Sequence, residues 1–213
     1  MPITQLTGAE VRVLGTLMEK ETTTPEYYPM SLNALVNGCN QKSNRDPVVN
    51  YDAATVEVAL EGLRHKRFAI FLTGSGRVDK YEQRISETLN LGRRESAILC
   101  TLFLRGPQTL GEIKDRSERI FTFGDLAETE RALEKLADWN GVPLVKKLAR
   151  QTGQKESRYA HLFSGEPIVE PLAESISTAA PNRIAQLEDE LRELRAEFDE
   201  LKRRFDALEN QLK

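Results

Sequence analysis

A polar run between two expected helices is the part of this sequence best suited to bind a ligand. Residues 40–46 read NQKSNRD, at a place where a helix-turn-helix normally has only a short turn. Amide and cationic side chains hydrogen-bond the edges of bases and the phosphates of nucleic acid. We therefore expect a loop that faces DNA, with Lys42 and Arg45 on phosphates. The other residues of this predicted site, which would probe or border a groove, are Asn40, Gln41, Ser43 and Asn44.

The same residue types also allow a structural interpretation of residues 40–46. Asn and Ser side chains hydrogen-bond nearby backbone groups and so hold long turns in shape. In that case Arg45 would pair with an acidic neighbour rather than with a phosphate. The sequence leaves both interpretations open.

Two expected β-hairpins carry a second group of cations. The first joins residues 68–73 to 78–84 through a Gly-Ser-Gly turn, and the second joins residues 144–149 to 157–163 through a turn around Gly153. A cationic hairpin can lie along a phosphate backbone, and each neutralised phosphate steepens the salt dependence of binding. Ordinary solubilising charge is the alternative. The candidate residues are Arg77, Lys80, Lys147, Arg150 and Lys155.

The helices expected before these hairpins carry acidic side chains. A helix that reads bases presents Arg, Lys, Asn or Gln to the major groove. Here the exposed positions include Glu57 and Glu61 in one helix, and Glu128, Glu134 and Asp138 in the other. Carboxylates repel phosphates. These faces therefore favour solvent or a protein partner over base reading.

Signatures of catalysis or of metal and cofactor binding are missing from the sequence. His65 and His161 are the only histidines, and neither has a Cys or carboxylate at ligand spacing. Cys39 and Cys100 have no motif spacing either, so we expect both thiols to pack in the core. We predict no catalytic residue, no metal site and no cofactor.

An internal repeat organises the chain. Leu6–Lys20 matches Leu91–Arg105, with helical apolar spacing in both copies. A second match pairs Ala59–Leu63 with Ala132–Leu136. A shorter helix is expected between the matched segments of each copy. Capping boxes are expected at Thr7, with Glu10, and at Thr109, with Glu112, while Ser31 could cap the shorter helix of the first copy.

Three helices followed by a hairpin, twice, is the order of a winged helix-turn-helix unit. We therefore predict a mainly α fold with small β-hairpins (α+β) and a C-terminal coiled-coil helix. The predicted parts are a first winged-helix domain at 1–86, a second at 87–164, a linker at 165–181 and the coiled-coil helix at 182–213.

Several polar and aromatic runs together carry a family resemblance. They are Thr22–Pro25, Tyr28–Leu35, Cys39–Val48, Lys80–Arg84, Leu104–Thr109 and Arg158–Glu166. In these runs, and over nearly its whole length, the chain resembles the YceH-like family of uncharacterised bacterial proteins. The resemblance implies a tandem winged-helix fold in a bacterium. It implies no activity, because the family has none that can be carried over.

The C-terminal segment has a heptad pattern typical of a coiled coil. A repeat of 3.5 residues gives a narrow apolar seam that one helix cannot bury alone. The flanking charges are of opposite sign only in a parallel, in-register pair. We predict a parallel homodimer, the alternative being a helix that folds back on its own globular part. The seam residues are Ile184, Leu187, Leu191, Leu194, Phe198, Leu201, Phe205, Leu208 and Leu212.

Composition and charge narrow the class of protein. The formal net charge is −3, and 39% of the residues are hydrophobic. This is not the strongly basic footprint of a tight nucleic-acid binder, although a local patch can lie within a near-neutral total. No run approaches the length of a membrane span and no leader is evident, so we expect a cytoplasmic protein without membrane contact.

Two functions fit these patterns. The first is a dimeric, non-enzymatic protein that binds double-stranded DNA as a regulator or accessory factor. The second is a scaffold for a protein partner with no direct DNA contact. An enzyme is disfavoured because no nucleophile–base pair can be assembled from the sequence.

Overall fold

The first half of the chain forms helices and one small sheet. The computed structural model describes residues 4–72, 79–150, 154–166 and 202. The helices of this half are α1 (Gly8–Thr23), a short 3-10 helix η1 (Pro25–Tyr27), α2 (Leu32–Cys39), α3 (Ala53–His65) and α4 (Ile85–Thr88). Its strands are β1 (Met30–Ser31), β2 (Ala69–Leu72) and β3 (Lys80–Gln83).

The second half repeats this order of elements. Its helices are α5 (Arg93–Arg105), α6 (Leu110–Ser117) and α7 (Leu126–Ala137), and its strands are β4 (Gln108–Thr109), β5 (Val145–Lys147) and β6 (Arg158–His161). The protein is therefore a mixed α and β structure, with helices predominating and short antiparallel strands. Below, the two halves are called the first repeat (residues 6–83) and the second repeat (residues 91–161).

Each repeat contains one three-stranded antiparallel sheet with the same strand order. The orders are β1-β3-β2 and β4-β6-β5. A tyrosine of the central strand has a partner on both sides in each sheet: Tyr81 faces Met30 and Phe71, and Tyr159 faces Gln108 and Lys147. In each sheet, the outer two-residue strand directly precedes α2 or α6 and pairs with the second strand of the hairpin.

Side-chain caps begin the helices of both repeats at matching places. The predicted capping boxes of Thr7 with Glu10 and of Thr109 with Glu112 are both present. Ser31 caps α2 as predicted. Asp52 and Asp125 cap α3 and α7, because each carboxylate accepts a hydrogen bond from the third amide of its helix.

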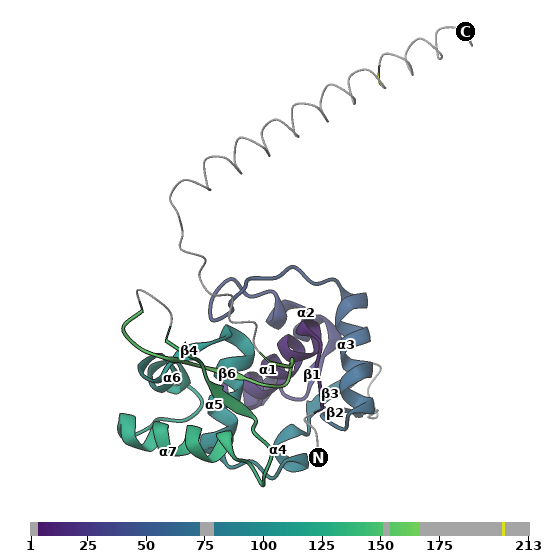
Figure 1. Ribbon diagram of the computed structural model, residues 1–213. Coiled ribbons are helices and arrows are strands. Elements are labelled where there is room, and N and C mark those ends of the chain that lie inside the picture. Colours follow the sequence, from purple (N-terminus) through teal and green to yellow (C-terminus); the bar gives the residue numbers. More distant parts are fainter. Residues whose placement is uncertain (1–3, 73–78, 151–153, 167–201, 203–213) are drawn as a thin grey trace, which may run out of the picture. The chain divides into compact units, whose positions relative to one another are not determined.

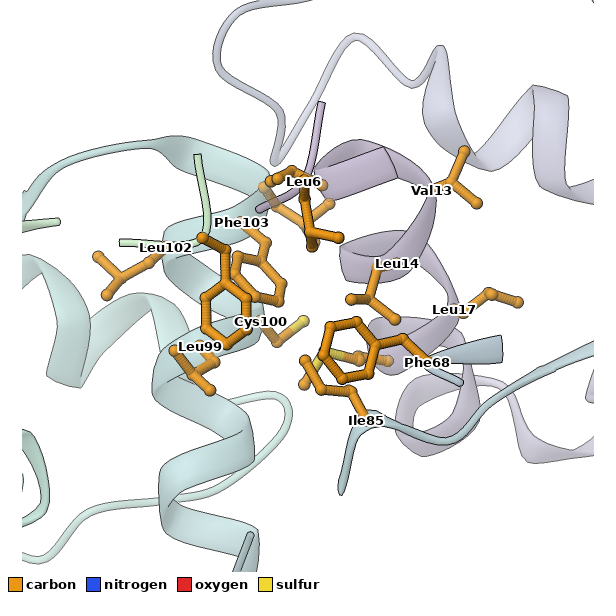
Figure 2. Close-up of a cluster of buried hydrophobic side chains, with 14 of the residues drawn as sticks. Leu6, Val13, Leu14, Leu17, Phe68, Ile85, Leu99, Cys100, Leu102 and Phe103 are labelled. Atoms are coloured by element: carbon orange, nitrogen blue, oxygen red, sulfur yellow. The ribbon is translucent and has the colours of Figure 1, made fainter. Parts of the chain in front are cut away.

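The two repeats share one core, which lies between α1 and α5. Figure 1 shows these helices in the middle of the fold, with α2 and α3 on one side and α6 and α7 on the other. Residues 10–19 of α1 are all buried. Figure 2 shows the apolar side chains that meet here, among them Leu14, Phe68, Leu99 and Phe103.

A glycine allows α1 and α5 to approach closely. A Cβ atom built on Gly15 would lie 2.9 Å from Cβ of Phe103, closer than real Cβ contacts. The buried Cys100 thiol donates to the carbonyl oxygen of Gly15, with a donor–acceptor distance of 3.4 Å. Cys100 takes the place of Gly15 in the internal repeat. The equivalent positions of the two helices thus pack directly on each other.

The described residues up to 166 form one compact unit. The predicted boundary between residues 86 and 87 falls within α4, whose Ile85 is buried in the common core. The predicted linker is described only to residue 166, and all seam residues from Ile184 to Leu212 lie outside the described part of the chain. The coiled coil stays a prediction. Within the described residues, no helix has both the length and the apolarity that a bilayer crossing requires.

Candidate nucleic-acid interface

The polar run of residues 40–46 begins a long loop between α2 and α3 that is fastened at both ends. The Asn40 side chain forms two hydrogen bonds with the backbone of Tyr51, each 2.8 Å long. One amide thus donates to the Tyr51 carbonyl oxygen and accepts from the Tyr51 N–H. These bonds close residues 40–51 into a ring, so Asn40 shapes the loop.

Arg45 points into the protein. Its side chain is fully buried, and its guanidinium donates to both carboxylate oxygens of Glu19 in α1, at 2.6 and 3.3 Å. It also donates through Nε to the carbonyl oxygen of Gly38, at 3.1 Å. The predicted phosphate contact of Arg45 is therefore not retained. The alternative interpretation, a pairing with an acidic neighbour, describes this residue.

A second buried arginine holds the same loop. Arg12 of α1 donates to the carbonyl oxygens of Cys39 and Pro47, at 3.3 and 2.6 Å. Burial, and then the nearby charge of Arg45, lower the pKa of Arg12. Arg12 and Arg45 both bond to the last carbonyls of α2, where a helix has unpaired acceptors and partial negative charge. Two guanidinium groups thus cap the C-terminal carbonyls of α2 and anchor the loop.

The loop also joins the first repeat to the second. Asn44, in the left-handed region with a φ of 58°, accepts a hydrogen bond from the Arg105 guanidinium at the end of α5. The Asp46 N–H donates to the carbonyl oxygen of Leu104, at 2.9 Å. Asn44 consequently joins the two repeats through its hydrogen bond with Arg105. The sequence predicts instead that its side chain probes a DNA groove.

The remaining residues of the predicted loop site stay available for contact. Lys42 and Ser43 are exposed and Gln41 is partly exposed. Lys42 makes no ion pair or hydrogen bond with the described residues, so its ammonium group is free to meet a phosphate. The site predicted at residues 40–46 therefore reduces to Gln41, Lys42 and Ser43 at the tip.

The hairpin cations lie on the surface where the sequence predicted them. Lys80, Lys147, Arg150 and Lys155 are all exposed. The ammonium nitrogen of Lys147 lies 5.5 Å from the ring centroid of Tyr159, which holds its stem against the sheet. The nearby Lys146 and Arg158 have partners in Glu166 and the Pro107 carbonyl oxygen. The predicted residue Arg77 lies outside the described residues.

The helices before the hairpins present acidic and apolar surfaces. In α3, Glu61 pairs with Arg64 and also lies 3.2 Å from the His65 ring nitrogen. Val58 on the same helix is 74% exposed. In α7, Glu128 pairs with Arg94 of α5, at 2.6 Å. The carboxylates of Glu61 and Glu128 are thus engaged by cations of the same fold.

Comparison of the sequence with known proteins identifies a family. The family model described as "Protein of unknown function, DUF480" matches residues 6–154. A "UPF0502 protein" of Solibacter usitatus is 56% identical over 195 residues, which is 90% of this chain and 93% of the relative. The chain belongs to the DUF480 family. Proteins of the same name from Pelobacter propionicus and Opitutus terrae are 50% and 47% identical, over 89% and 91% of this chain and 90% and 85% of their own.

The family membership confirms the resemblance seen in the sequence. An uncharacterised bacterial family was expected, and the DUF480 match and its bacterial relatives supply one. The DUF480 match spans α1 to β5 and stops before β6. The relatives extend over most of the chain, so the similarity includes both repeats.

The two thiols of this DUF480 protein are buried in the core, and the second histidine is partly buried at its edge. Burial raises the pKa of Cys39 and of Cys100, so both thiols stay protonated at neutral pH. Burial also lowers the pKa of His161 to about 4. Its ring lies edge-on to Phe103, with centroids 5.0 Å apart. In the described part of the chain, His, Cys, Asp and Glu side chains form no group that could hold a metal ion.

Sequence reasoning missed Arg12 and Glu19, the two α1 residues that hold the loop. The internal repeat contained a signal for both. Arg12 aligns with Ala97 and Glu19 with Leu104, so each is charged at a position that is apolar in the other copy. A charged residue on the buried face of one copy alone indicates a polar partner that the other copy lacks. That partner is the loop of residues 40–52.

Proposed function

We propose that this DUF480 protein binds the phosphate backbone of double-stranded DNA through two winged-helix units, as a dimeric regulator or accessory factor. The observation that carries the proposal is the repeated order of helix, strand, two helices and two strands, with one strand order in both sheets. Winged helix-turn-helix units have this order. Two copies in one compact unit would offer two hairpins to one ligand.

The distribution of exposed charge supports contact through the hairpins. Lys147, Arg150 and Lys155 cluster on the second hairpin, and Lys80 lies on the first. None of them forms an ion pair with the described residues. Lysine and arginine near phosphates release condensed counterions, which drives binding and makes it sensitive to salt.

The acidic helices define the kind of binding that we propose. The carboxylates of Glu61 and Glu128 already have cationic partners within the fold. Contacts to phosphate position a protein without reading sequence. We infer a binder of low sequence selectivity, in which Lys42 at the loop tip adds one further phosphate contact.

Association through the C-terminal segment would strengthen such contacts. The predicted parallel coiled coil joins two chains and so brings four winged-helix units to one DNA. Linked weak sites gain affinity because later contacts become intramolecular. The dimer is part of the proposal, and light scattering on the full-length chain tests it.

Fluorescence anisotropy with a labelled duplex at several salt concentrations tests DNA binding. We expect affinity to fall steeply with salt, with a log–log slope of about 0.9 for each phosphate neutralised. Removing Lys147, Arg150 and Lys155 together, each as an Ala variant, should lower the slope by about 2 to 3. The control combines Arg67→Asn with Arg93→Ala, which removes two exposed cations outside the hairpins. Absence of binding at low salt, or equal slopes for both variants, contradicts the proposal.

A second candidate function, a scaffold for a protein partner, is favoured by one surface. A groove between the start of α1 and α3 is lined by the small apolar residues Ala9, Ala54 and Ala59 and by the exposed Val58. The capping carboxylate of Asp52 borders it. This surface suits a partner helix with small apolar residues flanked by lysine or arginine.

The scaffold candidate is tested by changing the groove alone. Val58→Asp should abolish capture of such a partner from a bacterial lysate and leave the salt dependence of DNA binding unchanged. The control is Glu57→Gln, an exposed neighbour on α3. A partner that is retained by Val58→Asp argues against this surface.

A further inference from the structure

A small cavity lies where the two repeats meet. It is bordered by α1, the loop of residues 40–46, α5, α6 and the turn after α6, and its polar lining includes Glu19, Asn44, Arg105, Arg116 and Arg119. We call it the junction cavity. The Cys100 and Leu104 side chains form part of its apolar lining.

Three arginines of the second repeat converge on the junction cavity, and two of them have no carboxylate partner. Arg105 donates to the amide oxygen of Asn44 and forms no ion pair with the described residues. Arg119, in the turn after α6, is exposed and forms neither an ion pair nor a hydrogen bond through its side chain within the described part. Arg116 is held by Glu112, at 3.1 Å, and by Gln108.

The carboxylates near the junction cavity leave an excess of positive charge. Glu19 is the acidic residue of the lining, and it is neutralised by Arg45 and by Lys20. Glu19, and to a smaller extent Asp46, lie close enough to favour the charged form of Arg105. Burial, and then repulsion from Arg116, nonetheless lower the pKa of Arg105. The guanidinium groups therefore face one another with too few carboxylates between them.

We propose that the junction cavity binds an oxyanion of the phosphate type. Its volume of about 30 Å³ admits two or so oxygen-sized atoms, so part of one oxyanion enters and the rest stays in solvent. Guanidinium groups match the oxygens of phosphate with paired, directional hydrogen bonds. The anion is either free, as phosphate or a small phosphate ester, or is a phosphate of the DNA backbone.

The bound oxyanion would connect the two repeats. Arg116 belongs to α6 and Arg119 to the turn that follows it, whereas Asn44 belongs to the loop of the first repeat and is itself held by Arg105. An anion that contacts Arg105 and Arg119 fixes the turn after α6 against that loop. This site is separate from the hairpin cations, so it does not depend on their role in DNA binding.

Calorimetric titration of the full-length chain with inorganic phosphate tests the junction cavity. Ionic strength is held constant with chloride. We expect phosphate to bind and to raise the melting temperature above that in chloride alone. Arg119→Gln should weaken binding at least ten-fold without altering the fold, because that side chain has no partner in the described part. Arg105→Gln should weaken binding as well, and the matched control Arg131→Gln, on α7, should bind as the natural chain does.

Competition with a duplex identifies the source of the phosphate. If duplex DNA displaces inorganic phosphate, and Arg119→Gln weakens both, the ligand is a backbone phosphate. If phosphate binds equally with and without duplex, the ligand is a free anion. The proposal is overturned if phosphate and chloride have the same effect on the natural chain, or if Arg119→Gln binds phosphate as tightly as Arg131→Gln.

Discussion

The two repeats have one topology but connect their second and third helices differently. The first repeat uses residues 40–52, which are fastened by Arg12, Arg45 and Glu19. The second uses only residues 118–125. At the positions of Arg12 and Glu19 the second repeat has Ala97 and Leu104. The repeat with the longer loop is therefore the one whose first helix, α1, has buried charged residues at these positions.

This difference shows how a small fold accommodates an added segment. A loop placed over a core carries backbone groups that lose water and must find partners. Here buried guanidinium groups supply donors for the carbonyls of Gly38, Cys39 and Pro47. The second repeat has the shorter connection, and its residues at the two matching positions, Ala97 and Leu104, are apolar and buried. The buried guanidinium groups that hold this loop therefore belong to the first repeat and have no counterpart at the matching positions of the second.

The largest expected effect comes from breaking the buried ion pair of the first repeat. Glu19→Ala leaves the Arg45 guanidinium buried without its carboxylate, which should lower the free energy of unfolding by about 3–5 kcal/mol. Urea denaturation of the full chain measures the loss. The double variant Glu19→Leu with Arg45→Met imitates the apolar second repeat and should lose less than Glu19→Ala. A loss under about 1 kcal/mol for Glu19→Ala would show that the pair is not buried as described.

The next largest effect concerns the pH dependence of stability, to which His161 of the second repeat should contribute. The pKa of His161 in the fold, about 4, lies below its unfolded value of about 6.5. The fold therefore favours the neutral ring. Its stabilising contribution is complete above pH 6.5 and is lost as the pH falls from 6.5 towards 4, by on the order of 3 kcal/mol.

The matching position of the first repeat supplies the control for His161. Gln83 occupies it, and its side chain donates to Glu21. His161→Gln should remove most of the loss between pH 6.5 and 4, as measured by urea denaturation at several pH values. An unchanged acid response in this variant would assign the effect to other groups.

A smaller effect is expected where α1 and α5 touch. Gly15→Ala places a Cβ atom 2.9 Å from Cβ of Phe103, so the helices must separate slightly. Overpacking of this kind costs about 1–3 kcal/mol. Gly8→Ala is the control, since nothing lies within 4 Å of its added Cβ. Thermal unfolding should rank Gly15→Ala well below Gly8→Ala, and equal melting temperatures would contradict the close approach.

The smallest effect should follow from exchanging a polar pair between repeats. Cys39 donates to Thr16 in the first repeat, at 3.6 Å, and Ser117 bonds to Thr101 in the second, at 3.0 Å. Cys39→Ser therefore reproduces the pairing of the second repeat and should change stability by only about 1 kcal/mol. Cys39→Val removes the donor and serves as the comparison. A larger loss in Cys39→Ser than in Cys39→Val would show that the two sites are not equivalent.

Local patterns predicted much of this fold. The strands of both hairpins lie within one or two residues of their expected ends, and the capping residues Thr7, Ser31 and Thr109 cap the helices expected of them. The signals were short-range, namely apolar periodicity, glycine in turns and a hydroxyl three residues before a glutamate. Such signals depend only on neighbours in the sequence.

Features that depend on distant partners could not be predicted in this way. The two-residue strands β1 and β4 exist because β3 and β6 pair with them from far along the chain. The loop of residues 40–46 was expected to face outward because its residue types resemble those of DNA contacts. Arg45 instead turned inward towards Glu19, a partner 26 residues earlier. Residue types alone do not predict whether a side chain faces solvent or the core. Comparison of the two copies would have indicated buried charge at positions 12 and 19, and hence a polar partner for it.

The central position of α1 has a consequence for how this protein can be divided. Residues 10–19 are covered by both repeats at once, so a fragment ending near residue 86 would carry a bare apolar surface into water. Such a half should aggregate on its own and should be recovered in soluble form only when it is produced together with the other half.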